Sequence, residues 1–239
     1  METKGQKLRA IAIVPAYNEQ DTIESVVNEI FRSAPNIAVA VIDDGSRDNT
    51  FVRAKKTKAR VLRLPFNMGI GAAVQTGFKF AFANGYDIAI QVDGDGQHAP
   101  EFIPQMLEII ESGGADVVSG SRFLEKEGYQ SSFIRRLGIK FFELVYKILV
   151  RMDVTDCTSG FRAFGPNALR VVAENYPDDY PEPEAVIMLH KAGLRFMEIP
   201  VIMRDRQGGK TSIRGFKPLH YMIKVSLALI MNKIRKVER

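Results

Sequence analysis

Five short apolar runs rich in β-branched residues recur along the first half of the chain, and each has the length of a buried strand. Helical patterns separate several of them, with apolar residues at helical spacing in residues 18–31 and 69–85. Near-continuous apolar strands that alternate with helices are typical of a mainly parallel sheet covered on both faces. The sequence therefore predicts an α/β fold with strands at residues 10–14, 38–42, 60–64, 87–92 and 115–120.

Polar loops follow three of these expected strands. They are PAYNE (15–19), DDGS (43–46) and DGDGQ (93–97). In open parallel sheets, ligands bind beyond the carboxyl ends of the strands. We therefore expect the three loops to meet at one crevice, which is a stronger signal than any of them alone.

The acidic pair Asp93 and Asp95 is the most specific feature of these loops. If the strand continued through the pair, both side chains would point to the same face. A solvated turn is one interpretation, since Asp and Gly are common turn residues. A calcium loop of the EF-hand type does not fit, because His98 and Pro104 stand where that loop needs a glycine and a carboxylate. The convergent loops favour a Mg²⁺ or Mn²⁺ ion that also binds a substrate diphosphate.

Other phosphate-binding and nucleophilic motifs fit poorly. GIGAAV (69–74) begins like a dinucleotide-binding fingerprint, but Val74 replaces the third glycine and the segment follows the third strand. The chain has no P-loop motif, and its three histidines lack the spacing of a zinc set. The single cysteine, Cys157, is interpreted as a packing residue.

The composition indicates one globular unit. Of the 239 residues, 46% are hydrophobic, which is enough for one substantial core, and no linker or repeat divides them. We expect the second half to add a long amphipathic helix at 131–152, a loop into a short strand at 156–164, and then a helix and a strand. These segments are expected to pack on the active edge of the sheet.

Charge and targeting signals indicate which partners the protein binds and where in the cell it acts. The 33 Lys and Arg against 28 Asp and Glu give a net charge of +5, which favours anionic partners, and we expect no nucleic acid among them. The single cysteine excludes an intrachain disulfide, and the polar start METKGQK is not a signal peptide, so a cytoplasmic location is expected. No apolar run is long enough to span a bilayer; the nearest is interrupted by Lys224 and Lys233.

The segment at residues 216–239 is expected to form an amphipathic helix. It combines a broad apolar surface with several Lys and Arg and one acid, Glu238. Such a helix suits the interface of an anionic membrane. Packing on the protein's own core or in a homo-oligomer is an alternative, as is docking onto a small membrane protein.

Seven motifs occur in order along the chain, namely IVPAYNE (13–19), VIDDGSRDNT (41–50), FNMGIGAAVQTG (66–77), QVDGDGQH (91–98), SGSRF (119–123), DCTSGFRAF (156–164) and EIPVIMRDRQGGKTSI (198–213). In this order they resemble glycosyltransferase family 2, most closely its dolichol-phosphate mannosyltransferase and bacterial polyprenyl-phosphate branch. The resemblance covers residues 8–215. It implies a GT-A fold, which is Rossmann-like, and an inverting transfer from a nucleotide sugar to a polyprenyl phosphate, dependent on Mg²⁺ or Mn²⁺.

The resemblance also implies site residues, which we give by role. Those for nucleotide-sugar binding are Pro15, Ala16, Tyr17, Glu19, Ile42, Asp44, Asp93, Gly94 and Asp95. The metal ligands are Asp93, Asp95 and Gln97, and the catalytic residues are Asp95, Arg122 and Arg206. The residues for the acceptor phosphate are Arg136, Ser159, Arg162 and Lys210.

The sequence departs from the family pattern in two places. Thr211 and Ser212 stand where the family commonly has Ser-Lys, with Lys210 one residue earlier. The membrane-spanning C-terminal helices of many bacterial relatives have no counterpart in this sequence. We therefore expect a single GT-A domain over 1–239, with a nucleotide-sugar half (8–120), an acceptor half (121–215) and a membrane-proximal helix (216–239), acting peripherally at the inner face of the cell membrane.

The sequence allows two chemical classes of acceptor. A lipid phosphate is already an anionic nucleophile and needs no general base, whereas a saccharide hydroxyl needs one. Glu182 and Glu184 are the candidate bases under that alternative, and otherwise they are solvated acids at a helix start. A catalytically silent nucleotide-sugar-binding subunit is a further alternative, although Asp93, Asp95 and Gln97 argue against it. A UDP-sugar is favoured over GDP-mannose, and the product would be a lipid-linked sugar for cell-envelope glycan or glycoprotein synthesis.

Overall fold

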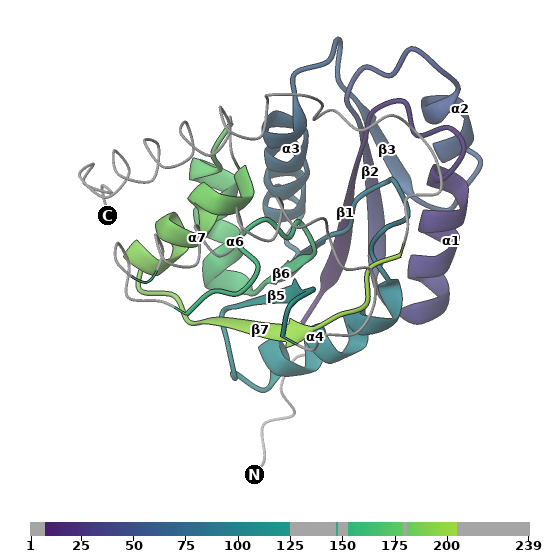
Figure 1. Cartoon of the computed structure of the whole chain (residues 1–239). Coiled ribbons are helices and arrows are strands. Elements are labelled where there is room, and N and C mark those ends of the chain that lie inside the picture. Colours follow the sequence, from purple (N-terminus) through teal and green to yellow (C-terminus); the bar gives the residue numbers. More distant parts are fainter. Residues whose placement is uncertain (1–7, 125–146, 148–152, 179–180, 205–239) are drawn as a thin grey trace.

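A seven-stranded, mainly parallel sheet forms the centre of the protein (Figure 1). The computed structural model describes residues 8–124, 147, 153–178 and 181–204. All five strands predicted from the first half are present, and the strand order is β3-β2-β1-β4-β6-β5-β7. The strands are β1 (Ala10–Ala16), β2 (Ala38–Asp43), β3 (Arg60–Arg63), β4 (Ile88–Gln91), β5 (Val117–Ser121), β6 (Arg162–Phe164) and β7 (Phe196–Pro200).

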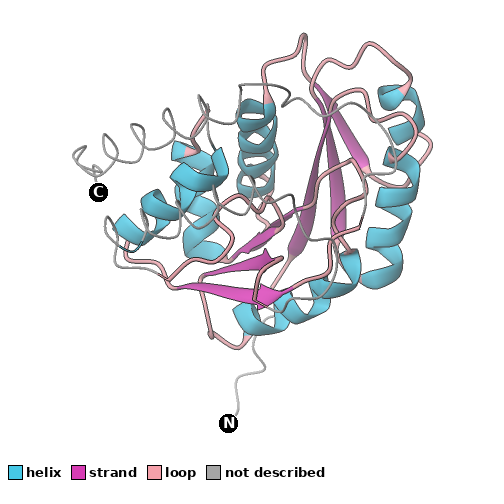
Figure 2. Ribbon diagram, in the orientation of Figure 1, coloured by secondary structure: helices cyan, strands magenta, loops and turns pink. Residues whose placement is uncertain are grey.

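Helices cover both faces of the sheet, so the α/β prediction is confirmed (Figure 2). Buried residues of α1 and α4 pack on one face, and those of α3, α6 and α7 pack on the other. The helices are α1 (Ile23–Ser33), α2 (Thr50–Ala54), α3 (Ile70–Ala83), the 3₁₀ turn η1 (Pro100–Phe102), α4 (Ile103–Glu111), α6 (Pro166–Asn175) and α7 (Pro181–Lys191).

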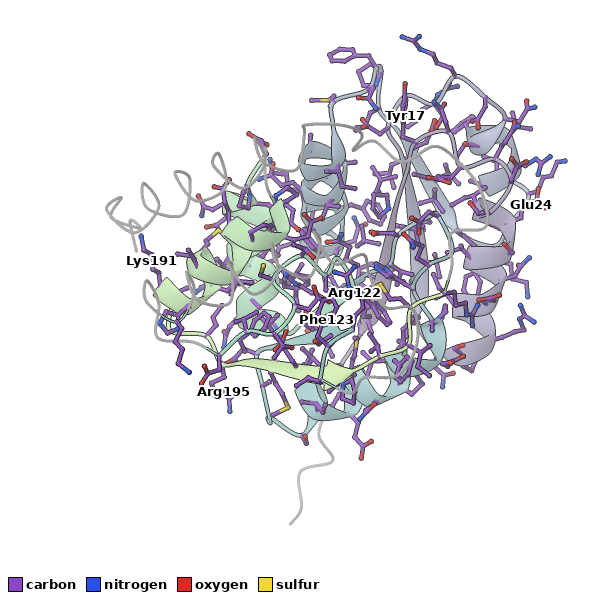
Figure 3. The ribbon with its side chains drawn as sticks, in the orientation of Figure 1. Tyr17, Glu24, Arg122, Phe123, Lys191 and Arg195 are labelled. Carbon is purple, nitrogen blue, oxygen red and sulfur yellow. The ribbon has the colours of Figure 1, made fainter. Side chains whose placement is uncertain are left out.

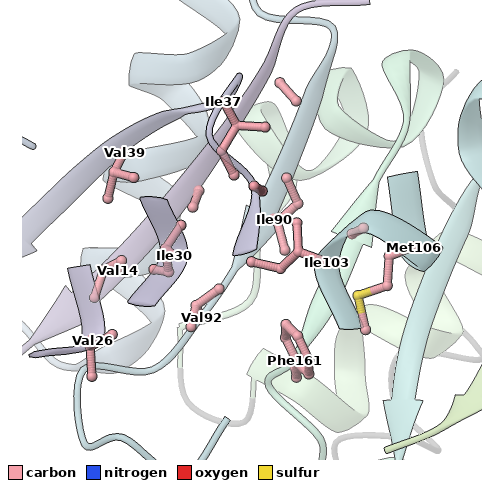
Figure 4. Packing of buried hydrophobic residues seen from close by; sticks show 14 of the residues in the cluster. Val14, Val26, Ile30, Ile37, Val39, Ile90, Val92, Ile103, Met106 and Phe161 are labelled. Carbon is pink, nitrogen blue, oxygen red and sulfur yellow. The ribbon is translucent and has the colours of Figure 1, made fainter. Parts of the chain in front are cut away.

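The two faces of β1 serve two separate hydrophobic clusters. Ile11 and Ile13 belong to the cluster beneath α3, and Ala12 and Val14 belong to the cluster beneath α1. All four side chains are fully buried, as the two-residue period of a strand covered on both sides requires. Figure 4 shows the cluster beneath α1, which also contains Ile30 of α1 and Ile103 of α4.

The second half of the chain enters the sheet instead of only packing against its edge. The short strand β6 lies antiparallel between β4 and β5, and its Arg162 pairs with Gln91 on one side and Ser119 on the other. Our expectation for these segments was wrong in this respect. The three residues of β6 are all buried, so this end of the DCTSGFRAF motif becomes part of the core.

Three helices were not predicted, namely α2, α4 and α6. Prolines in the first turns of α4 and α6 are the sequence signals that could have indicated the last two. Within the described residues, no helix is both long enough and apolar enough to cross a bilayer. The helices expected at 131–152 and 216–239 lie outside the described residues, apart from Lys147.

Candidate active site

One cavity of about 780 Å³ opens at the carboxyl ends of β1, β2 and β4. The three predicted loops all reach it, which confirms that they converge. The side chains and backbone that line it are Pro15, Ala16, Tyr17, Asn18, Glu19, Asp44, Asn67, Gly69, Ile70, Ala73, Asp93, Gly94 and Asp95. The set contains four acidic residues and no lysine or arginine among the described residues.

The first loop is tied to the second by hydrogen bonds. The backbone N–H of Glu19 donates to Thr50 Oγ1 at 2.8 Å, and that of Asn18 donates to Ser46 Oγ at 3.0 Å. Asn18 has a φ of 56°, which turns the chain sharply after β1. Tyr17 is left 38% exposed at the mouth of the cavity, where Figure 3 shows it beyond the end of β1.

Asp44 supports the wall of the cavity. Its Oδ1 accepts a hydrogen bond from the backbone N–H of Met68 at 2.7 Å, and its Oδ2 accepts from Gly69 N and from Asn67 Nδ2, both at 3.0 Å. Burial raises the pKa of the Asp44 carboxyl, while the two backbone donors oppose that rise. Asp44 therefore holds the loop before α3 in place, and this loop carries the Asn-Met-Gly of the FNMGIGAAVQTG motif.

The acidic pair lies in a turn and not in a strand. β4 ends at Gln91, and Asp95 Oδ1 accepts the backbone N–H of Gln97 at 3.0 Å. The strand continuation considered for the pair is therefore wrong, but both aspartates still line the same cavity. A Cβ on Gly94 would lie 3.0 Å from the carbonyl oxygen of Pro15, so glycine lets this turn pack closely on the end of β1.

The donors around this turn suit a hard divalent cation. Asp93 and Asp95 supply carboxylates, and Gln97 is oriented by a 3.4 Å hydrogen bond from its Nε2 to the backbone oxygen of Arg204. The described residues contain no cluster of three or more His, Cys, Asp or Glu that could enclose a metal. This donor set is the kind that Mg²⁺ and Mn²⁺ use when waters and substrate phosphates complete the coordination.

Arg122 lies at the end of β5, beside Phe123 (Figure 3). Its Nε and Nη2 donate to the two carboxylate oxygens of Asp156 at 2.6 and 2.7 Å, and Nη2 also donates to Thr158 at 2.7 Å. Burial opposes the guanidinium charge, but the bond to Asp156 and the nearby charge of Asp93 raise the pKa of Arg122 overall. Arg122 is therefore a permanent cation within electrostatic reach of Asp93.

The loop that carries Asp156 is held by β7. Glu198 accepts hydrogen bonds from the backbone N–H groups of Thr155 and Asp156 at 2.7 and 2.9 Å. Thr155 is also bonded to Ser121 at 2.6 Å. Sequence reasoning missed Asp156 and Glu198, because only the fold brings residues some 40 positions apart together here.

Several predicted site residues lie away from the cavity. Arg162 is 1% exposed and donates to the backbone oxygens of Glu182 and Cys157 at 2.8 and 2.9 Å. Ser159 is equally buried, and Ile42 packs in the cluster beneath α3. None of these three residues lines the cavity. Arg136, Arg206 and Lys210 lie outside the described residues.

Glu182 and Glu184 lie in the first turn of α7, as expected of acids at a helix start. Both are partly buried, so the expectation that they are solvated is wrong. Burial and the nearby charge of Asp93 raise the pKa of Glu182 to about 7. Cys157 is buried, and burial raises the pKa of its thiol to about 12, which agrees with a packing role.

An α/β sheet with acidic loops at its carboxyl edge is the architecture of GT-A glycosyltransferases. Glucosyl-3-phosphoglycerate synthase from Mycobacterium tuberculosis, crystallised with Mn²⁺, UDP-glucose and phosphoglyceric acid, has this fold. It superposes with a TM-score of 0.73 at 22% identity, over 97% of this chain and 81% of that one. The fold prediction is therefore confirmed.

The sequence comparisons then identify the family. The model of glycosyl transferase family 2 matches residues 11–172. A UDP-N-acetylglucosamine–dolichyl-phosphate N-acetylglucosaminyltransferase of Methanococcus voltae is 30% identical, over 92% of this chain and 97% of the relative. A polyprenol monophosphomannose synthase of Mycolicibacterium smegmatis is 27% identical, over 91% and 86%. The chain belongs to glycosyltransferase family 2.

Proposed function

We propose that the protein transfers a sugar from a nucleotide sugar to a polyprenyl phosphate, using Mg²⁺ or Mn²⁺ held by Asp93, Asp95 and Gln97. The observation that carries this proposal is the charge of the cavity. Four acidic residues line it, and no cationic side chain does so within the described residues. An anionic nucleotide diphosphate is repelled by such a surface unless a cation lies between them.

The bound ion would stabilise the negative charge that develops on the diphosphate as the sugar leaves. The protein's own residues prepare the site for this step. Asp44 holds the cavity wall, and Tyr17 offers an aromatic face at the mouth of the cavity for the nucleotide. Arg122, kept charged by Asp156, adds a second positive charge near Asp93.

The acceptor class is supported by the relatives. Those from Methanococcus voltae and Mycolicibacterium smegmatis are named for dolichyl phosphate and polyprenol, and they match almost the whole chain. Their names differ in the sugar, N-acetylglucosamine in one and mannose in the other. We propose a UDP-linked sugar because the chain resembles bacterial members of the family. Arg136, Arg206 and Lys210 remain the candidates for contacts with the acceptor and the diphosphate.

The proposed setting is the inner face of the cell membrane, where residues 216–239 would bind anionic lipid as an amphipathic helix. We propose one catalytic domain, with residues 8–120 binding the nucleotide sugar and residues 121–215 binding the acceptor. The product would be a lipid-linked sugar for cell-envelope glycan or glycoprotein synthesis.

A saccharide hydroxyl is the second candidate acceptor, and Glu182 is the observation that favours it. A carboxylate with a pKa of about 7, electrostatically coupled to Asp93, has the properties of a general base. A hydroxyl acceptor would need such a base, whereas a phosphate acceptor would not.

The test supplies purified protein with radiolabelled UDP- and GDP-sugars and Mn²⁺, together with undecaprenyl phosphate, undecaprenol or an oligosaccharide. Our proposal expects labelled lipid only with the phosphate, and none in EDTA. Label on the oligosaccharide would favour the second candidate. Tight nucleotide binding with no transfer to any acceptor would indicate a non-catalytic subunit.

A further inference from the structure

Both ring nitrogens of His98 lie close to Asp93. The backbone N–H of Asp93 donates to His98 Nδ1 at 2.9 Å, and His98 Nε2 lies 3.6 Å from Asp93 Oδ2. Because Nδ1 accepts a hydrogen bond, the neutral ring carries its proton on Nε2, which is the nitrogen nearer the carboxylate. The His98 side chain therefore lies against both the backbone and the carboxylate of Asp93, the residue at which the turn begins.

The protein core holds this ring in place. His98 is 4% exposed and stacks on Phe161, with ring centroids 5.0 Å apart and planes 17° from parallel. Phe161 is fully buried and belongs to the cluster that contains Ile103 and Met106 of α4 (Figure 4). A ring packed in this way has little freedom to turn, so its two nitrogens keep their directions.

A second buried side chain, that of Gln91, contacts the other carboxylate oxygen of Asp93. Gln91 Nε2 donates to Asp93 Oδ1 at 3.4 Å, and Tyr176 donates from its hydroxyl to Gln91 Oε1 at 3.3 Å. The tyrosine therefore directs the amide nitrogen of Gln91 toward Asp93. A Cβ on Gly160 would lie 3.2 and 3.3 Å from the two Asp93 oxygens, so the backbone of this loop packs against the carboxylate as well.

We propose that His98 is a positioning residue for the divalent-ion site, where it sets the direction of the Asp93 carboxylate and the turn that leads to Asp95. This inference rests on the proposed ion-binding role of the two aspartates. Carboxylates that ligate metals are themselves hydrogen-bonded, and the loss of such outer partners typically costs about 10- to 100-fold in metal affinity. His98 does not line the cavity, so its effect on the nucleotide must pass through Asp93.

Three substitutions separate the two contacts. In His98→Asn the amide oxygen can take the place of Nδ1 and accept the Asp93 N–H. In His98→Gln the amide nitrogen can reach the place of Nε2 and donate to the carboxylate. His98→Leu removes both contacts. His190→Leu, on the exposed end of α7, is the matched control.

The experiment measures Mn²⁺ binding by electron paramagnetic resonance, with and without UDP, and UDP binding in EDTA. We expect Mn²⁺ affinity to fall about 10- to 100-fold in His98→Leu and by less in the Asn and Gln variants. UDP binding in EDTA and the His190→Leu control should match the wild type. Circular dichroism and urea unfolding establish that each variant is folded.

Wild-type Mn²⁺ affinity in a folded His98→Leu protein would overturn the inference while leaving the proposed function intact. If that variant does not fold, wild-type affinity in both the Asn and Gln variants would overturn it, because each lacks one contact. A wild-type protein that binds no Mn²⁺, with or without UDP, would overturn the proposed ion site and this inference together.

Discussion

Asp156 binds the guanidinium of Arg122 through two hydrogen bonds of 2.6 and 2.7 Å, and the Asp156 side chain is fully buried. Planar, two-point pairing of this kind fixes the position of an arginine more firmly than a single contact does. Since the pair joins the end of β5 to the loop before β6, it connects the first half of the chain to the second.

Removal of the Asp156 charge should therefore destabilise the fold. Asp156→Asn leaves Arg122 partly buried without its counter-ion, and such losses cost about 3–5 kcal/mol. Urea unfolding monitored by circular dichroism measures the change. Asp153→Asn, which breaks the exposed ion pair with Lys147, should have no measurable effect. Equal stability of the two variants would show that the Arg122–Asp156 pair contributes little.

Asp95→Asn should abolish ion-dependent transfer without unfolding the protein. Asp95 lines the cavity, and loss of its charge should lower transfer about 100-fold or more, as expected when a group that stabilises developing charge is lost. Transfer to undecaprenyl phosphate and Mn²⁺ binding are the measurements, and Glu111→Gln on the exposed end of α4 is the charge-matched control. Full activity of Asp95→Asn, or undiminished activity of the wild type in excess EDTA, would contradict the metal assignment.

The strands and the three convergent loops could be predicted from sequence because both depend on local patterns. Apolar runs at residues 10–14 and 38–42 identify strands, and parallel pairing then places the loops that follow them at one edge. The cavity contained the expected aspartates for that reason.

The second half could not be predicted in the same way. β6 has only three residues, and its position depends on pairing Arg162 with Gln91 and Ser119, which are far away in sequence. That pairing buries Arg162, so a residue that matches a phosphate-binding motif is bonded to the protein's own backbone. The contact of His98 with Asp93 likewise depends on the ring's orientation, which the spacing of the two residues does not reveal.

Arg162→Lys distinguishes a structural role from an acceptor-binding role. Lysine cannot reach the Glu182 and Cys157 carbonyls together, so at least one buried acceptor would lose its partner, at a cost of about 1–3 kcal/mol. We expect lower stability in urea and an unchanged KM for lipid phosphate in the folded protein. A raised KM for lipid phosphate with unchanged stability would instead return Arg162 to the acceptor site.

Glu182 should make stability depend on pH in a direction opposite to that of most carboxylates. Its folded pKa of about 7 lies above the ordinary value of 4.5, so between these pH values the folded protein binds more protons than the unfolded chain. Stability therefore falls as the pH rises from 4.5 through 7, and Glu182→Gln should remove this pH dependence.

The measurement is the difference in Tm between wild type and Glu182→Gln at pH 5, 6, 7 and 8. We expect the wild type to lose stability relative to the variant by on the order of a few degrees across this range, with little further change above pH 8. Glu111→Gln should show no such trend, and a constant difference for Glu182→Gln would mean that the carboxylate is ionised throughout.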